Sequence, residues 1–138
     1  MWDLGVMKFR YKKITDEILR PIIPIEIAYK NQRVRYEVLV DSGADSNIFD
    51  AEIGRILNID IEKGGKKTVG GITGIPEDYY VYPVTINIGG WEYKTQAGFL
   101  PNIARLGYGI VGQKGFFDIF IVKFDLVKAS IELKERKS

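Results

Sequence analysis

The chain has 138 residues, a formal net charge of +2, 46% hydrophobic and 28% charged residues, which is an ordinary globular composition. This length fits one domain with its own hydrophobic core, so we expect residues 1–138 to form a single domain. The absence of cysteine and histidine excludes disulfides, Ser-His-Asp and Cys-His catalysis and most zinc sites.

The first half of the chain is predicted to be mostly strands, because its apolar residues alternate with polar ones. Residues 22–29 place Ile23, Ile25 and Ile27 on one face and are expected to form a hairpin with residues 33–40. Before this hairpin, we expect an N-terminal strand or extension within residues 1–20, to which the sequence assigns no role.

A short helix is predicted within residues 50–59, where Ile53, Ile56 and Leu57 have helical spacing and Asp50 is a candidate N-cap. The second half returns to strands, with a clear hairpin around Gly89-Gly90. The expected order is a loop (62–67), a strand interrupted by glycines (67–80), the hairpin arms (80–88 and 91–100), a loop or helical turn (101–107), a strand, a glycine, a short helix and a strand (108–125), and a last strand (129–135).

One feature stands out in this pattern: the apolar strand within residues 36–40 runs straight into Asp41, and the next residues are Ser42 and Gly43. A catalytic carboxylate needs such a setting, with a strand to fix its backbone, a hydroxyl to lock the loop and a glycine to permit close approach. Two such carboxylates held together cannot both ionise, so they share one proton and can act as base and acid. Asp41 is therefore the candidate catalytic residue.

Three motifs together resemble the retropepsin-like aspartic proteases. "LVDSGA" (39–44) is similar to their Asp-Thr/Ser-Gly-Ala signature, "VGGITG" (69–74) to their glycine-rich flap, and "GIVGQKGFF" (109–117) to the segment that braces the active-site loop. The resemblance spans residues 22–133. It implies an all-β fold, a small closed β-barrel with one or two short helices. Because the chain holds one Asp-Ser-Gly loop, it also implies a homodimer with two Asp41 residues at the two-fold axis.

The resemblance further implies an aspartic endopeptidase that hydrolyses an extended peptide or protein substrate through one activated water, with neither a metal nor a cofactor. Gln113 follows Gly112, where many viral members carry an arginine that pairs with the acid at the position of Asp45. The implied site residues are the catalytic Asp41; the loop residues Ser42, Gly43, Ala44 and Asp45; the flap residues Gly70, Gly71, Ile72, Thr73 and Gly74; and the brace residues Ile110, Val111 and Gly112.

Other interpretations of Asp41 stay open at this point. Asp41, Asp45, Asn47 and Glu52 match some positions of a calcium-binding loop, but Gly43 and Ser46 break the pattern and a strand precedes it. A phosphate site lacks its further motifs, and a plain turn aspartate is common after strands. A catalytically silent module for dimerisation or peptide binding is the main alternative function.

No apolar run approaches the roughly 20 residues of a membrane span, and the N-terminus lacks the order of a secretion signal. The small net charge and the lack of an RNA-binding motif give no indication of nucleic acid. We therefore expect a cytoplasmic protein with neither a membrane nor a nucleic-acid partner.

Overall fold

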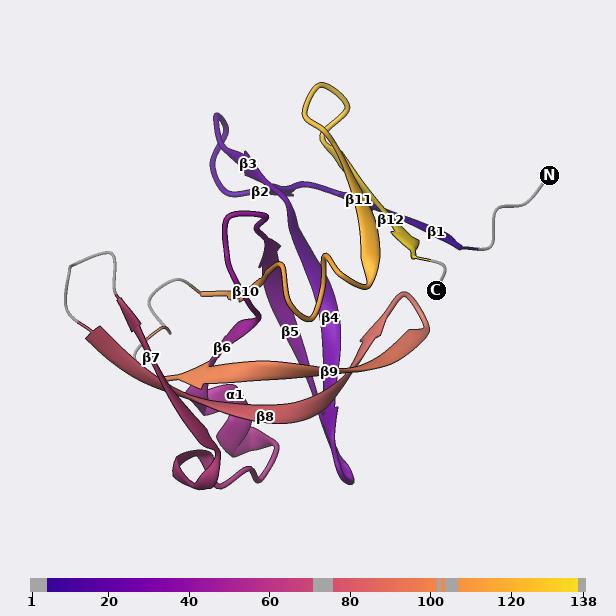
Figure 1. Cartoon of the computed structure of the whole chain (residues 1–138). Coiled ribbons are helices and arrows are strands. Elements are labelled where there is room, and N and C mark those ends of the chain that lie inside the picture. The colour runs from indigo at the N-terminus through magenta and orange to yellow at the C-terminus, as the bar shows by residue number, and fades with distance from the viewer. Residues whose placement is uncertain (1–4, 71–75, 102, 104–106, 137–138) are drawn as a thin grey trace.

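The computed structural model describes residues 5–70, 76–101, 103 and 107–136 (Figure 1). Within them, the largest sheet has the strand order β4-β5-β10-β6-β9-β8-β7, and a further pairing of β4 with β8 closes six of these strands into a barrel. The all-β barrel predicted from the sequence is therefore confirmed. Its strands are β4 (Ile22–Tyr29), β5 (Gln32–Val40), β6 (Ile48–Asp50), β7 (Gly65–Gly70), β8 (Pro76–Ile88), β9 (Trp91–Leu100) and β10 (Gly109–Val111).

The barrel closes because β8 is long enough to serve three neighbours. Its first half pairs with β7 and its second half with β9, while residues 85–87 also pair with β4 in the register Ile27↔Ile86. The β4–β5 and β8–β9 hairpins were both predicted, and both are antiparallel pairs in the structure. Gly89 and Gly90 form the β8–β9 turn with φ of 57° and 87°, backbone angles that favour glycine.

Strand alternation fills the barrel interior with aliphatic and aromatic side chains. Ile23, Ile25 and Ile27 of β4 are buried as predicted, and Val38 and Phe99 reach the same core from β5 and β9. A strand sends alternate side chains to opposite faces, so each strand closes the core with one face and meets solvent with the other. Burial of these side chains is the main stabilising contribution to the barrel.

A second sheet of three strands lies beside one end of the barrel, in the order β1-β12-β11 (Figure 1). Ile131 and Leu133 of β12 are fully buried and join the barrel core, so the two sheets share one hydrophobic interior. A small pair, β2 with β3, precedes β4. The bounds are β1 (Val6–Arg10), β2 (Lys12–Lys13), β3 (Leu19–Arg20), β11 (Phe120–Asp125) and β12 (Ser130–Glu135).

The predicted helix is α1 (Ala51–Ile56), and the Asp50 side chain accepts a hydrogen bond from the Glu52 amide as its N-cap. Gly54 faces the core, where a Cβ would lie 2.3 Å from Cδ1 of Ile61 and 3.0 Å from Cδ1 of Phe99. A larger residue would therefore push the helix off the barrel. Among the described residues, no helix is long and apolar enough to cross a membrane.

Two local predictions were wrong. The loop expected at residues 62–67 is a 3₁₀ turn, η1 (Ile61–Lys63), and β7 begins after the single residue Gly64. The short helix expected after Gly112 is a series of turns, because Gly115 has φ of 100°, far from helical values. The amides of Phe117 and Asp118 accordingly bond to carbonyls five residues earlier, a wider spacing than in an α-helix.

Candidate active site

The strand β5 ends at Val40 and delivers Asp41 into a tight turn. The Asp41 amide donates to the Val111 carbonyl (3.0 Å), the Asp41 carbonyl accepts from the Ala44 amide (3.1 Å), and Oδ1 accepts from the Gly43 amide (2.9 Å). The residue is half-buried, whereas Ser42 and Gly43 are exposed. Oδ2 accepts no hydrogen bond from the described residues, so one carboxylate oxygen is available for a water or a second carboxylate.

The strand β10 fixes both ends of this loop, residues 41–47. It pairs in parallel with β5, in the register Ile110↔Leu39, and in antiparallel fashion with β6 through Ile110↔Ile48. One short strand therefore separates the chain entering the loop from the chain leaving it. The predicted brace residues Ile110, Val111 and Gly112 lie against the loop.

Gly112 meets the backbone of the loop itself. A Cβ at this position would lie 2.6 Å from the Ala44 oxygen and 2.7 Å from the Ser46 oxygen. Both neighbours are backbone atoms, which cannot rotate out of the way as a side chain can. Only glycine permits this close approach, so the loop and the end of β10 have matched shapes.

Gln113 takes up the position where viral members carry an arginine, and it holds the loop in another way. Its amide donates to the Ala44 carbonyl (2.9 Å), and its side-chain Nε2 donates to the Ser42 carbonyl (2.9 Å). Asp45 is exposed, and its backbone carbonyl accepts from the Lys114 amide (3.0 Å). Hydrogen bonds to the loop backbone therefore supply support where those members use an ion pair with the acid.

Asn47 is the anchor that sequence reasoning missed. Its side chain is fully buried, with Oδ1 accepting from the Gly112 amide (3.1 Å) and Nδ2 donating to the carbonyls of Gln96 (3.0 Å) and Gly115 (3.2 Å). The signal was a polar residue directly before the apolar pair Ile48-Phe49, which only the calcium interpretation had used.

The calcium interpretation of this loop does not fit the structure. Asn47 directs its oxygen to an amide, and Glu52 forms an ion pair with Arg55 at the start of α1. Within the part of the chain that the structure describes, no group of three acidic side chains is placed to hold a metal ion.

The predicted flap segment is only partly described. The strand β7 ends at Gly70, which pairs with Pro76 of β8, so the β7–β8 arm is an antiparallel ribbon up to that point. The flap residues Gly71, Ile72, Thr73 and Gly74 lie outside the described residues. In Figure 1 the described part of the arm lies at the left of the view, at the end of β8 away from the Gly89-Gly90 turn.

Behind the loop, Tyr36 of β5 supports the next strand. Its hydroxyl accepts from the Asp50 amide (3.2 Å), and its ring packs edge-on against Phe49. Burial raises the pKa of Tyr36 to about 12, because the charged phenolate would lose hydration there. Burial also raises the pKa of Tyr93, whose hydroxyl has no hydrogen-bond partner among the described residues.

Comparison with solved structures shows that the chain has the retropepsin-like fold. The structure is similar to a retropepsin-like aspartic protease from Rickettsia conorii with a TM-score of 0.66 and 16% sequence identity, over 94% of this chain and 92% of that chain. A second similar structure is the EIAV protease complexed with the inhibitor HBY-793, with a TM-score of 0.49 and 24% identity, over 72% of this chain and 88% of that chain. No protein-family model matches the sequence, and no curated protein does either.

Proposed function

We propose that this chain, which has the retropepsin-like fold, is an aspartic endopeptidase that works as a homodimer. One observation carries the proposal: β5 ends in Asp41 at a loop that β10, Gly112 and Asn47 hold in place, within that fold. A plain turn aspartate does not need this support from distant parts of the chain. The similar Rickettsia conorii structure is itself described as an aspartic protease.

The chemistry needs a second carboxylate, and a second copy of the chain supplies it. With the two Asp41 residues at the two-fold axis, charge repulsion would keep one of them protonated. The ionised carboxylate would take a proton from a water that attacks the peptide carbonyl. The protonated one would give its proton to the carbonyl oxygen. As the tetrahedral intermediate collapses, the first carboxyl would pass the proton from the water to the leaving amine, and the second would take back the proton of the intermediate's hydroxyl. The free Oδ2 of each Asp41 is the atom available for this work.

The remaining residues of the loop would position the reaction. Ser42, exposed beside Asp41, would hydrogen-bond across the dimer and hold the two loops in register. Gly43 would leave room for the substrate backbone. The β7–β8 arm, with its tip at residues 70–74, would cover an extended peptide that lies between it and the loop. We propose that this chemistry uses neither a metal nor a cofactor. We also propose that the protein works in the cytoplasm.

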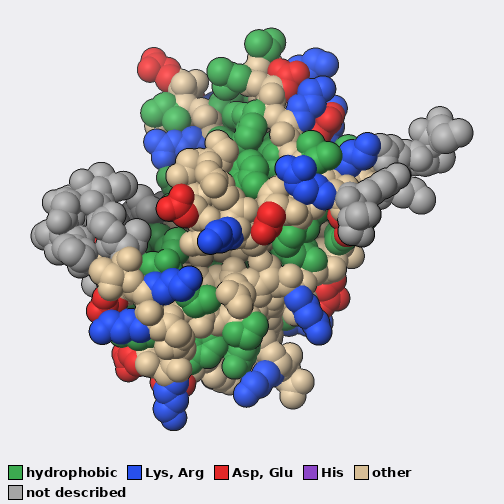
Figure 2. Space-filling view, in the orientation of Figure 1, with side chains coloured by type: hydrophobic (Ala, Val, Ile, Leu, Met, Phe, Trp, Pro, Cys, Tyr) green, Lys and Arg blue, Asp and Glu red, His purple; other side chains and the backbone are tan. Residues whose placement is uncertain are grey.

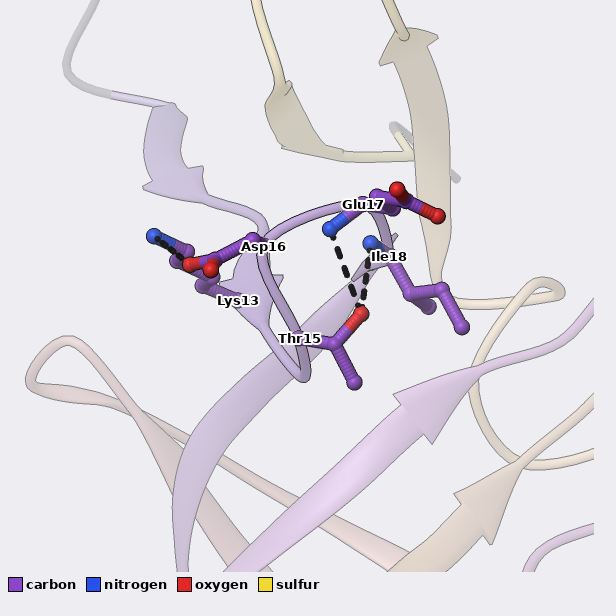
Figure 3. Close-up of polar contacts among 5 residues, drawn as sticks. All are labelled: Lys13, Thr15, Asp16, Glu17 and Ile18. Carbon is purple, nitrogen blue, oxygen red and sulfur yellow. Dashed lines mark hydrogen bonds and ion pairs between the residues drawn. The ribbon is translucent and has the colours of Figure 1, made fainter.

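Replacing Asp41 tests the proposal directly. We expect the wild type to cleave members of a peptide library at mildly acidic to neutral pH, and Asp41→Asn to reduce cleavage by at least about a thousandfold. The matched control is Asp16→Asn, the same change at a 96% exposed side chain in the β2–β3 loop (Figure 3). Equal cleavage by wild type and Asp41→Asn would falsify the proposal.

The wild type and Asp41→Asn also distinguish the endopeptidase from the alternative function, a catalytically silent dimerisation or peptide-binding module. Such a module would bind peptides without cleaving them, in the wild type and in Asp41→Asn alike. Sedimentation at micromolar concentration tests the shared site. A chain that stays monomeric with and without peptide contradicts the two-copy mechanism, because one copy offers one Asp-Ser-Gly loop.

A further inference from the structure

A pocket of about 490 Å³ opens beside the Asp41 loop. Its walls come from one face of the β7–β8–β9 sheet, from the loop residues Ser46 and Asn47, and from the turns after Gly112. The sheet contributes Lys67, Tyr79, Val81 and Lys94 to the lining, and the turns contribute Lys114 and Asp118.

Three lysines line this pocket, and they have no acidic partner. None of the ion pairs among the described residues includes Lys67, Lys94 or Lys114. The single acid on the lining is Asp118, and its Oδ1 accepts from the Gly115 amide (2.9 Å). The pocket therefore has an excess of positive charge. In Figure 2, Lys and Arg side chains are visible over β9 and the connection from β10 to β11.

The strand register explains why Lys67 is separated from the carboxylate that pairs with its neighbour Lys66. Lys67 lies opposite Tyr79 on the pocket face, whereas Lys66 projects from the other face and pairs with Asp78 (3.2 Å). The Thr68 hydroxyl also donates to Asp78 on that other face (2.9 Å). Two adjacent lysines thus differ in one respect: Lys66 has a carboxylate partner, and Lys67 faces an open pocket.

The pocket can also hold the stem of a side chain. The Tyr79 ring lies over Gly98, where a Cβ would be 2.4 Å from Cδ2 of the ring, and Val81 continues this apolar wall. An apolar wall with ammonium groups around it suits a carboxylate on a short aliphatic stem, as in glutamate. Because β7 and the Asp41 loop both border the pocket, an extended peptide held between them would run into it.

We propose that this pocket is a specificity subsite for an acidic side chain of the peptide substrate, at a position remote from the cleaved bond. The proposal rests on the endopeptidase function proposed above. Each exposed lysine contributes a modest attraction, and three of them around one carboxylate give about a fivefold preference for Glu over Gln. Because the charges are exposed, added salt would weaken the preference.

The test is a peptide library in which each position in turn holds Glu or Gln. We expect the wild type to show one position, remote from the cleaved bond, where kcat/KM for Glu exceeds that for Gln by about fivefold. In the variant Lys67→Gln/Lys94→Gln/Lys114→Gln the preference should fall below about twofold, with cleavage of the Gln peptide retained. The matched control Lys66→Gln should keep the wild-type preference.

Three results would overturn the subsite: no acidic preference in the wild type, full preference in the triple variant, or equal loss in Lys66→Gln. Thermal unfolding is to be measured for every variant, as a control that the variant is folded. Inorganic phosphate should weaken the preference more than chloride does at matched ionic strength, because it competes for the same three lysines. A preference that saturating phosphate leaves unchanged would contradict the assignment to this pocket.

Binding to Asp41→Asn separates this proposal from the function it rests on. Fluorescence anisotropy of labelled Glu and Gln peptides should show tighter binding of the Glu peptide, lost when the three lysines are also replaced. If the wild type cleaves nothing but this difference is seen, the endopeptidase function fails and the pocket for an acidic side chain stands. If the wild type cleaves without the difference, the pocket fails and the endopeptidase function stands.

Discussion

Two loops of this molecule each carry an exposed or half-exposed aspartate, and they are held in opposite ways. In the β2–β3 loop, the Thr15 hydroxyl accepts from the amides of Glu17 and Ile18, and Lys13 pairs with Asp16 (3.0 Å), so each contact joins residues two or three positions apart (Figure 3). In the Asp41 loop, the partners are Gly112 and Gln113, 65 and 71 residues away from the atoms they contact.

The difference shows how a loop can be positioned by more than its own turn. Local hydrogen bonds define the shape of the β2–β3 loop, but they do not tie it to the rest of the fold. The Asp41 loop is tied to β10 and β9, so its carboxylate has a fixed place relative to the barrel and to any symmetric partner. Substitutions that remove long-range contacts should therefore cost much more stability than those that remove local ones.

The largest effect is expected for Asn47→Asp. This change keeps the acceptor for the Gly112 amide but places a carboxylate oxygen against the carbonyls of Gln96 and Gly115. We expect a loss of about 4 kcal/mol in the free energy of unfolding, because an unpaired charge is buried. Urea unfolding at pH 7 measures it. A loss below about 1 kcal/mol would contradict the role of Asn47 as an anchor.

The second largest effect is expected for Gly112→Ala, with a loss of about 3 kcal/mol in the free energy of unfolding. The new methyl group would lie against two backbone oxygens of the loop. The matched control is Gly65→Ala in β7, where a Cβ meets nothing within 4 Å. We expect the control to stay within about 0.5 kcal/mol of wild type in the same urea experiment. Similar losses at both positions would show that the approach of β10 to the loop is not tight.

Tyr36→Phe tests a contact of intermediate range, since Tyr36 and Asp50 are 14 residues apart. Losing the hydroxyl leaves the Asp50 amide without this acceptor, which should lower the free energy of unfolding by about 1 kcal/mol. The raised pKa of Tyr36, about 12, predicts the pH dependence. Stability from the neutral phenol is fully present below the ordinary tyrosine pKa of 10.0 and is lost as the pH rises towards 12.

Alkaline unfolding measures this second effect. Between about pH 9 and pH 11.5, the wild type should lose stability more steeply than Tyr36→Phe, because only the wild type carries this phenol. The buried Tyr93 adds a further loss to both proteins, because burial raises its pKa as well. Parallel curves for the two proteins would contradict the assignment to Tyr36.

The smallest effect is expected for Thr15→Ala, which removes a hydroxyl that bonds only to exposed amides of its own loop. We expect a change of less than about 0.5 kcal/mol and wild-type peptide cleavage. A loss as large as that of Gly112→Ala would remove the distinction between the two loops.

Sequence patterns predicted the parts of the fold that depend on near neighbours. Alternation placed Ile23, Ile25 and Ile27 in the core, and the Asp50 N-cap and the Gly89-Gly90 turn are local devices. The pairing of β4 with β8 was not predictable in this way, because no local pattern states which distant strand closes a barrel.

The same limit applies to the site. Asp41 and the glycine motifs are readable as residue types in order, so the loop and its brace were proposed from sequence. The Asn47 and Gln113 side chains form hydrogen bonds to backbone atoms far along the chain, and one sequence carries no pattern for those contacts. The sequence predicted a helix after Gly112, because the residue types there do not indicate that Gly115 adopts a φ of 100°.

The placement of β10 between β5 and β6 also determines when the Asp41 loop can assemble during synthesis of the chain. Asp41 is synthesised early, but the strand that separates the two limbs of its loop is made about 70 residues later. At typical ribosome speeds of about 5–20 residues per second, several seconds pass before that strand emerges. Until then the contacts that position the Asp41 carboxylate are missing, so a nascent chain cannot hold the assembled Asp41 loop before β10 has been inserted.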